Sequence, residues 1–317
     1  MKVLCTPSSF KSKEEIPALT ALKEFADEIV INPQHRPLEE DELIELLQDC
    51  DGMVAGIDFI TTRVLNACPK LKVVSRYGVG YDRVDIAAAK ENGIVVTNTP
   101  GANAMAVADL AIGLLLAVAR EIPRLDKGMK EDKWLKSDGV EIYEKTIGIL
   151  GLGAIGKGVA KRAQGFSMKV LAYDPFMNME YAKSNNITPV SLDELLEQSD
   201  FISLHLPATP ETFNLLDKAA MSKMKKGAII INTARGGIID DGAAYELLKS
   251  GHLGGMGIDA FVDEPPKHIP LFDLDNVVLT PHTAAHTAEA MNNMANMSVQ
   301  NLIDVLSGKE CPFIVNR

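Results

Sequence analysis

The segment from residue 146 to residue 174 constrains the fold of this chain more than any other. It begins with an apolar run, TIGIL, that has the composition of a buried β-strand. The run GLGAIG follows at once, and a stretch with helical character comes next. A strand, a glycine turn and a helix in this order begin a unit that binds a dinucleotide. The segment therefore predicts a parallel α/β sheet with a nucleotide site at one edge.

The three glycines of this turn have separate roles in that prediction. Gly151 permits the tight turn, Gly153 lets the backbone approach a pyrophosphate, and Gly156 lets helix and strand pack closely. The first turn of the helix then offers N–H groups and a positive dipole end to the phosphates. A lone glycine pattern of this kind can also be purely structural, but the strand before it and the helix after it favour binding.

Asp174 ends the next predicted strand, KVLAYD. A carboxylate there accepts hydrogen bonds from ribose hydroxyls and repels a 2′-phosphate. The next residues are Pro175 and Phe176, so no arginine follows to bind such a phosphate. The alternative is an ordinary turn aspartate, but together with the glycine turn the pattern favours NAD over NADP.

The rest of the chain repeats the alternation of short β-branched runs with helical stretches, which is typical of parallel sheets. Its 317 residues are about twice a typical single domain, so we expect two domains. The first series has predicted strands at 2–5, 28–31, 52–55, 72–75 and 94–97, with helices at 38–48 and 83–92. The second has six predicted strands, at 146–150, 169–173, 201–204, 228–232, 255–259 and 277–279.

Two long helices are predicted to join the domains, at 104–120 and at 287–306. Thr287 is the expected N-cap of the second helix, and Gly308 its stop. If this helix returns the chain to the first domain, that domain is discontinuous. The stretch 120–145 contains the only tryptophan, Trp134, and is predicted to be a loop or arm.

Composition excludes several classes of protein. A formal net charge of -11 argues against a binder of nucleic acid or of anionic membranes. The longest apolar run, 110–119, is shorter than the ~20 residues that span a bilayer, and the N-terminus does not resemble a signal peptide. The four cysteines form no C-x-x-C pair, so we expect no disulfide framework and no metal site. We therefore expect a cytoplasmic protein.

Polar residues follow three strands of the second series. Arg235 comes after IIINTA, Asp259 and Glu264 lie in GIDAFVDEPP, and His282 follows VVLT. Since the carboxyl ends of parallel strands meet at one edge, we expect these side chains near the cofactor. Arginine can bind a carboxylate with two hydrogen bonds, and histidine exchanges protons near neutral pH. A surface arginine and an ordinary loop histidine are the alternatives for single residues.

With these motifs assembled, the chain resembles the D-isomer-specific 2-hydroxyacid dehydrogenases, closest to the phosphoglycerate dehydrogenase branch. The resemblance rests on RYGVGYDRVD, GLGAIG with Asp174, NTARGGIID, GIDAFVDEPP and TPHTAAHT. It implies an NAD-dependent enzyme that transfers a hydride between a D-2-hydroxy acid and its 2-keto acid. The substrate would be phosphoglycerate or a similar small acid of the hydroxypyruvate or glyoxylate type.

The resemblance also implies an architecture. The fold class would be α/β with two doubly wound parallel sheets, in which a Rossmann NAD-binding domain (100–285) is inserted into a flavodoxin-like substrate domain (1–99 and 286–317). The family forms homodimers through the NAD domain, and Trp134 could then reach the partner subunit. Because the chain ends at Arg317, we expect the short form without a regulatory domain.

Site residues follow from the same resemblance. The implied catalytic set is Arg235, Glu264 and His282, of which Arg235 and His282 would also touch the cofactor. Asp259 would bind the nicotinamide carboxamide. Further cofactor contacts are expected at Gly151, Gly153, Ala154, Ile155, Gly156, Asp174, Leu206, Thr233, Ala234 and Ala285. Substrate contacts are expected at Arg76, Gly78, Val79, Gly80 and Asn103, and no metal is expected.

The chain departs from the family pattern near the substrate. Ala55 stands where some phosphoglycerate enzymes have an arginine for the phosphate, and the nearby Asp58 is acidic. Both residues argue against a phosphorylated substrate. A replacement anion site is conceivable at Ser8, Ser9 and Lys11, although an ordinary loop is the simpler interpretation of this segment.

Two other functions remain as alternatives. An NAD-sensing corepressor on the same fold would keep such a triad with little turnover, but the tails of such proteins have no counterpart here. Another type of Rossmann oxidoreductase would carry a Tyr-x-x-x-Lys motif, which we do not find.

Overall fold

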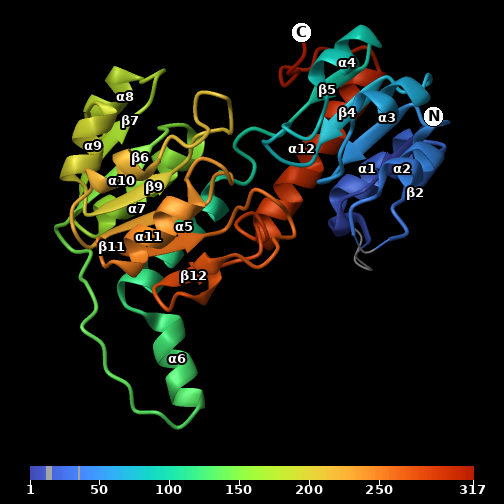
Figure 1. Ribbon diagram of the computed structural model, residues 1–317. Helices are drawn as coiled ribbons and strands as arrows, with labels where there is room; N and C mark the ends of the chain where they lie inside the picture. Colours follow the sequence, from blue (N-terminus) through green and yellow to red (C-terminus); the bar gives the residue numbers. More distant parts are fainter. Residues whose placement is uncertain (12–15, 35) are drawn as a thin grey trace. The chain divides into compact units, whose positions relative to one another are not determined.

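Parallel strand pairing organises both sheets of this protein, whose computed structural model describes residues 1–11, 16–34 and 36–317 (Figure 1). The chain divides into two units. The first unit combines Met1–Asn103 with His286–Arg317, and the second is Ala104–Ala285. The first unit is thus built from both ends of the sequence, and the change of unit falls after Asn103, where the sequence predicted residue 99.

The first unit contains a five-stranded sheet with the order β2-β1-β3-β4-β5. Its strands are β1 (Lys2–Cys5), β2 (Glu28–Ile31), β3 (Gly52–Ala55), β4 (Val73–Arg76) and β5 (Val95–Thr97). Its helices are the 3-10 turn η1 (Ser8–Lys11), α1 (Pro17–Phe25), α2 (Glu40–Leu47), α3 (Thr62–Ala67), α4 (Ile86–Glu91) and α12 (Ala288–Leu306). Because β1, β3 and β4 are almost entirely buried, helices must cover both faces of the sheet.

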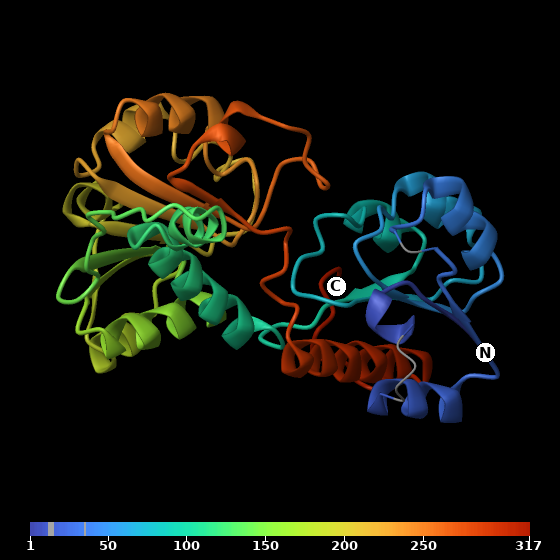
Figure 2. The ribbon, with the colours of Figure 1, turned by 90° about the horizontal axis from the view of Figure 1, so that it is seen from below.

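Two apolar cores lie on the two faces of this sheet. One packs α2, α3 and α4 against it, and the other packs α1 and α12, which lie side by side (Figure 2). Thr287 caps α12 as predicted, since its hydroxyl accepts a hydrogen bond from Ala290 N at 3.1 Å. The C-terminal tail then pairs with the edge of β5 through a single antiparallel bridge between Thr97 and Ile314.

The second unit contains a seven-stranded sheet with the order β12-β11-β10-β9-β6-β7-β8. Its strands are β6 (Thr146–Leu150), β7 (Lys169–Tyr173), β8 (Ile187–Pro189), β9 (Phe201–Leu204), β10 (Ala228–Asn232), β11 (Leu253–Ile258) and β12 (Val277–Leu279). Its helices are α5 (Ala104–Ala119), α6 (Ile122–Lys130), α7 (Ala154–Gly165), α8 (Met179–Ser184), α9 (Leu192–Gln198), α10 (Lys218–Ser222), α11 (Asp241–Lys249) and the 3-10 turn η2 (Pro270–Asp273).

This sheet also has a core on each face. Residues of α5 and α7 pack on one face, and residues of α9, α10 and α11 pack on the other. Both units are therefore doubly wound, and the predicted fold class is confirmed. None of the helices in the described ranges is long and apolar enough to cross a membrane.

The structure differs from the sequence prediction in a few elements. The sheet of the second unit has a seventh strand, β8, whose three residues end in a proline at the sheet edge and are too short to show a pattern. The stretch 120–145 contains helix α6, because Ile122, Leu125 and Met129 recur at helical spacing among charged residues. Other limits move by one to three residues, as in β4, β11 and α4.

The glycine turn makes a testable contribution to stability. A Cβ atom at Gly156 would lie 2.1 Å from the carbonyl oxygen of Gly151, so Gly156→Ala must displace backbone. We expect this variant to melt roughly 5 °C or more below the wild type, since overpacking costs about 1–3 kcal/mol. Gly165→Ala is the control, because a Cβ at the end of the same helix meets nothing within 4 Å. Circular dichroism melts that showed equal losses would contradict the packing argument.

Candidate functional site

The glycine turn after β6 brings three strands together. Gly151 has φ +94°, in the left-handed region, and its N–H donates to the carbonyl oxygen of Tyr173 at the end of β7. A Cβ at Gly151 would lie 2.6 Å from the carbonyl oxygen of His205, just beyond β9. The turn is therefore pressed between β7 and β9, and only glycine fits at this position.

The N-terminus of α7 is open in front of this turn. The N-cap residue is Gly153, and no side chain caps the helix. A Cβ at Gly153 would meet nothing within 4 Å. The first N–H groups of a helix lack partners within the helix and concentrate positive potential. Gly153, Ala154 and Ile155 thus form an uncapped helix start that can receive a phosphate.

Asp174 lies next to this helix start. Its carboxylate accepts hydrogen bonds from Leu152 N at 2.7 Å and from Phe176 N at 2.8 Å. These bonds fix the carboxylate beside the glycine turn and leave each oxygen able to accept a further hydrogen bond. The structure thus places Asp174 beside the helix start, and its contact with a ribose stays a prediction.

Two buried polar atoms at the same sheet edge have no hydrogen-bond partner among the described residues. They are Nδ1 of His205, which follows β9, and Oγ1 of Thr233, which follows β10. Since buried polar groups are normally paired, each atom needs a partner that the described residues do not supply. Leu206 and Ala234, both predicted cofactor contacts, are buried directly after them, and Ala285 is partly exposed at the end of the unit. This edge, the glycine turn and Asp174 together fit a dinucleotide.

The sequence interpretation overlooked His205. The ring makes one hydrogen bond, between Nε2 and the Ser203 hydroxyl at 2.8 Å, and burial lowers its pKa to about 3. Its position directly after the buried strand β9 is a usable signal, because His282 also lies shortly after a strand, β12.

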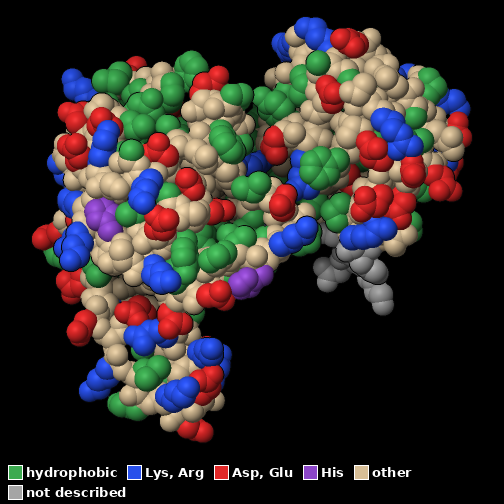
Figure 3. Space-filling view, viewed as in Figure 1, with side chains coloured by type: hydrophobic (Ala, Val, Ile, Leu, Met, Phe, Trp, Pro, Cys, Tyr) green, Lys and Arg blue, Asp and Glu red, His purple; other side chains and the backbone are tan. Residues whose placement is uncertain are grey.

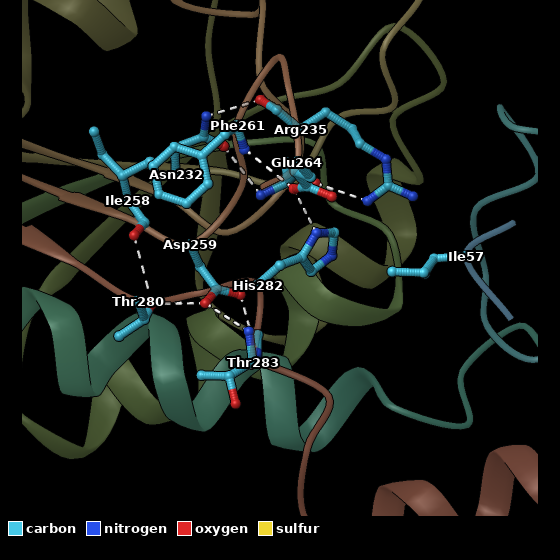
Figure 4. Close-up of polar contacts among 12 residues, drawn as sticks. Ile57, Asn232, Arg235, Ile258, Asp259, Phe261, Glu264, Thr280, His282 and Thr283 are labelled. Carbon is cyan, nitrogen blue, oxygen red and sulfur yellow. Dashed lines mark hydrogen bonds and ion pairs between the residues drawn. The ribbon is translucent and has the colours of Figure 1, made fainter. Parts of the chain in front are cut away.

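His282 and Glu264 form the most direct pair of the site (Figure 4). Nδ1 of His282 lies 2.6 Å from Oε1 of Glu264, and the His282 side chain is 41% exposed. The same Glu264 oxygen accepts a hydrogen bond from Phe261 N at 3.2 Å. The bond at Nδ1 orients the imidazole and leaves its Nε2 for a substrate.

Asp259 holds the turn that carries His282. Its buried carboxylate accepts hydrogen bonds from the Thr280 hydroxyl at 2.6 Å, from Thr283 N at 2.9 Å and from Ala284 N at 3.0 Å. His282 itself has φ +48°, a left-handed conformation that is unfavourable for a non-glycine residue. The three bonds therefore stabilise the backbone that presents the imidazole, which is a role that the sequence did not predict. A contact of Asp259 with the nicotinamide stays a prediction.

Arg235 lies near His282 and Glu264, on a loop that is held by hydrogen bonds from the Asn232 side chain (Figure 4). The side chain of Asn232 donates to Arg235 O at 2.8 Å and accepts from Ala234 N at 3.0 Å. A Cβ at Gly236 would lie 2.1 Å from Val262 N, so this loop touches the one that carries Glu264. Figure 4 shows Arg235 beside Glu264 and His282. The structure thus brings together the three residues of the predicted catalytic set.

The first unit contains the predicted substrate loop, in which the carbonyl groups have hydrogen-bond partners and two of the N–H groups have none among the described residues. The carbonyl oxygens of Gly78, Val79 and Gly80 accept from Thr99 N, from the Asn98 side chain and from Arg76 Nε. The N–H of Gly78 donates to the Thr99 hydroxyl. No described residue accepts from the N–H groups of Val79 and Gly80. The loop therefore has two donors left for an anion.

Arg76 is almost entirely buried, and the substrate contact expected of it stays a prediction. The sequence suggested that it adds charge for the substrate, but its side chain belongs to a residue only 5% exposed. It donates to Ala55 O, which also accepts from Tyr77 N, and to Gly80 O, both at 3.1 Å. Arg76 thus holds the loop in shape.

For the other predicted residues of the first unit, the structure shows burial and hydrogen bonds but no feature specific to a substrate. Asn103 has a buried Oδ1 without a partner among the described residues. Asp58 is buried and accepts from the Thr6 hydroxyl and from Leu38 N. Ala55 is buried at the end of β3. The side chains of Ser8 and Lys11 lie outside the described residues, so their proposed anion site has no structural account.

Comparisons with known proteins agree with this geometry. A family model described as D-isomer specific 2-hydroxyacid dehydrogenase, NAD binding domain, matches residues 112–284. A glyoxylate reductase of Korarchaeum cryptofilum is 41% identical over 289 residues, which cover 89% of this chain and 87% of that protein. The D-lactate dehydrogenase of Aquifex aeolicus, solved with NAD and lactic acid, is 28% identical with a TM-score of 0.85, and 99% of each chain is covered.

A second kind of relative is longer than this chain. A D-3-phosphoglycerate dehydrogenase of Methanocaldococcus jannaschii is 42% identical over 283 residues, which cover 88% of this chain and 54% of that protein. The chain thus spans about half the length of this relative.

The low pKa of His205 predicts a pH dependence of stability. Unfolded His205 regains its ordinary pKa of 6.5 and binds a proton that the folded protein does not bind until about pH 3. Between these values the free energy of unfolding rises with pH, by up to about 1.4 kcal/mol per pH unit from this group. We expect His205→Gln to lose less stability than the wild type between pH 7 and pH 5, as measured by urea unfolding. His268→Gln, at an exposed histidine, is the control, and equal slopes in all three proteins would contradict the prediction.

Proposed function

Because the chain belongs to the D-isomer-specific 2-hydroxyacid dehydrogenase family, we propose that Arg235, Glu264 and His282 interconvert a small 2-hydroxy acid and its 2-keto acid. The chain is an NAD-dependent oxidoreductase of this family. The observation that carries the assignment of residues is the 2.6 Å contact of His282 with Glu264, beside Arg235. The corepressor alternative has no support among the relatives named above.

NAD, when bound, supplies or accepts the hydride of the reaction. The residues that would hold it lie in the second unit, at the uncapped start of α7 and at the neighbouring strand ends. The start of α7 would receive the pyrophosphate, Asp174 the adenosine ribose, and the buried atoms of His205 and Thr233 lie along the same edge. Asp174 would disfavour a 2′-phosphate through charge repulsion, which supports NAD over NADP.

His282 would exchange the proton of the reaction. Glu264 accepts a hydrogen bond from Nδ1, so that nitrogen keeps its proton and Nε2 becomes the exchanging atom. In oxidation Nε2 takes the proton of the substrate hydroxyl, and the resulting imidazolium is stabilised by the Glu264 carboxylate. In reduction protonated Nε2 donates to the carbonyl oxygen of the 2-keto acid.

Arg235 would bind the polar end of the substrate. The guanidinium can donate to the carboxylate and to the carbonyl oxygen, whose negative charge grows during reduction. The N–H groups of Val79 and Gly80 would donate to the carboxylate. Asn103, whose Oδ1 has no partner among the described residues, is a further proposed substrate contact.

A second copy of this chain is the partner that we propose for the second unit. Large apolar side chains are exposed on α6 and the segment after it, at Ile122, Met129, Trp134, Leu135, Val140 and Tyr143. Trp134 is 78% exposed, which is unusual for the largest apolar side chain. Figure 3 shows acidic and basic side chains intermingled over α6, a mixture that two copies can match. The homodimer would thus use α6 and residues 131–145.

The proton-exchange role predicts the behaviour of a His282→Ala variant. We expect kcat for 2-keto acid reduction to fall by at least about a thousandfold, since general acid–base catalysis contributes 10²–10⁴-fold and the substrate also loses a hydrogen bond. NADH affinity, measured by fluorescence titration, should change less than threefold. His268→Ala, at another exposed histidine, should keep full activity. Turnover that survives in His282→Ala would exclude the assignment.

The dimer predicts an effect of charge on the exposed apolar segment. Trp134→Lys should raise the dissociation constant of the dimer by at least tenfold in sedimentation equilibrium, because a buried lysine without a partner is unfavourable. Phe176→Lys changes an even more exposed aromatic residue outside this segment and should leave the association unchanged. An unchanged dissociation constant of the Trp134→Lys dimer would show that the interface does not include this segment.

A further inference from the structure

The exposed apolar side chains of the first unit are concentrated at one place. Apart from Met1, the large ones in its described residues are Ile57 and Phe59, after β3, and Val79 and Tyr81, after β4. Ile57 is 52%, Val79 37% and Tyr81 42% exposed. A unit that buries its apolar residues in two cores has no structural need to expose these.

The two loops that carry these residues form a single surface. β3 and β4 are neighbours in the sheet, and Arg76 donates both to Ala55 O and to Gly80 O, which ties the ends of the loops together. Farther along, Arg83 Nη1 donates to Ile57 O at 2.8 Å. The N–H groups of Val79 and Gly80 lie in the second loop, so the apolar side chains of Val79 and Tyr81 flank the proposed carboxylate site.

The arginines of these loops are already engaged. Arg76 is buried on two carbonyl oxygens, and the Arg83 guanidinium lies 4.7 Å from the centre of the Phe59 ring. Asp58, between Ile57 and Phe59, adds a buried carboxylate that accepts hydrogen bonds from the Thr6 hydroxyl and from Leu38 N. A substrate carboxylate bound at Val79 and Gly80 would therefore place its remaining substituent among apolar side chains.

We propose that Ile57, Val79 and Tyr81 form an apolar subsite that selects 2-hydroxy and 2-keto acids with an aliphatic substituent. This inference rests on the proposed function and narrows its substrate class. A substituent that contacts these side chains gains from burial, and each methylene changes kcat/KM by roughly tenfold or more. A distal phosphate would lose its hydration against the same side chains without a new cation. Glyoxylate has no substituent and gains nothing.

The first experiment compares substrates of the wild-type protein. NADH consumption is measured with glyoxylate, 4-methyl-2-oxopentanoate and phosphohydroxypyruvate. We expect kcat/KM for 4-methyl-2-oxopentanoate to exceed that for glyoxylate by at least tenfold, with phosphohydroxypyruvate below both. A higher kcat/KM for glyoxylate or phosphohydroxypyruvate would overturn the subsite.

The same ranking can be measured without turnover. Calorimetric titration of the three acids into NADH-loaded His282→Ala protein gives their dissociation constants. We expect 4-methyl-2-oxopentanoate to bind at least tenfold tighter than glyoxylate, and equal affinities would overturn the subsite. If the wild type consumes no NADH with any acid, the proposed function fails, while this titration still tests the subsite separately.

A matched pair of variants tests the residues themselves. Ile57→Val and Ile57→Thr give side chains of nearly the same shape that differ in polarity, at an exposed position where neither threatens folding. We expect Ile57→Thr to reduce kcat/KM for 4-methyl-2-oxopentanoate about tenfold, and Ile57→Val less than threefold. Glyoxylate should respond less than twofold to either variant. Equal effects of the two variants, or an equal loss with glyoxylate, would show that Ile57 acts only through loop structure and would overturn the proposal.

Discussion

Parallel pairing is the constraint on which the rest of this structure depends. It places the carboxyl ends of β6, β7, β9, β10, β11 and β12 at one edge of a single sheet. The glycine turn, Asp174, Arg235 and His282 are far apart in the sequence, yet each follows directly or closely after one of these strands. The pairing of the strands thus brings residues from several segments to one place, independently of the contacts that their side chains make.

Much of this arrangement could be predicted from sequence because it depends on local patterns. Strand composition and turn glycines fixed most element limits, and polar residues after apolar runs identified Arg235, Glu264 and His282. The sequence does not predict which hydrogen-bond partner each polar side chain finds in the folded protein. Arg76 has the sequence context of a substrate ligand, and nothing in that context predicts its bonds to Ala55 O and Gly80 O. β8 was missed because three edge residues have no periodicity.

In the site, Nδ1 of His282 is held by a hydrogen bond, whereas Nε2 of the same ring is available to a substrate. Asp259 fixes the backbone on the far side of His282 through Thr283 and Ala284, and Glu264 fixes Nδ1 of the ring. Two carboxylates from neighbouring segments thus restrain one imidazole, which lets a left-handed residue persist in an exposed turn. The His205 ring shows the opposite case, because burial keeps it neutral and leaves one nitrogen without a partner among the described residues.

The assembly of the first unit from both chain ends has a consequence for synthesis on the ribosome. One face of its sheet is covered by α12, through residues such as Val299 and Leu302. That face stays uncovered until α12 has been synthesised, whereas Ala104–Ala285 is by then complete and continuous. The cofactor unit can therefore fold first, although its sequence comes second, and the nascent N-terminal segment must wait with apolar surface exposed.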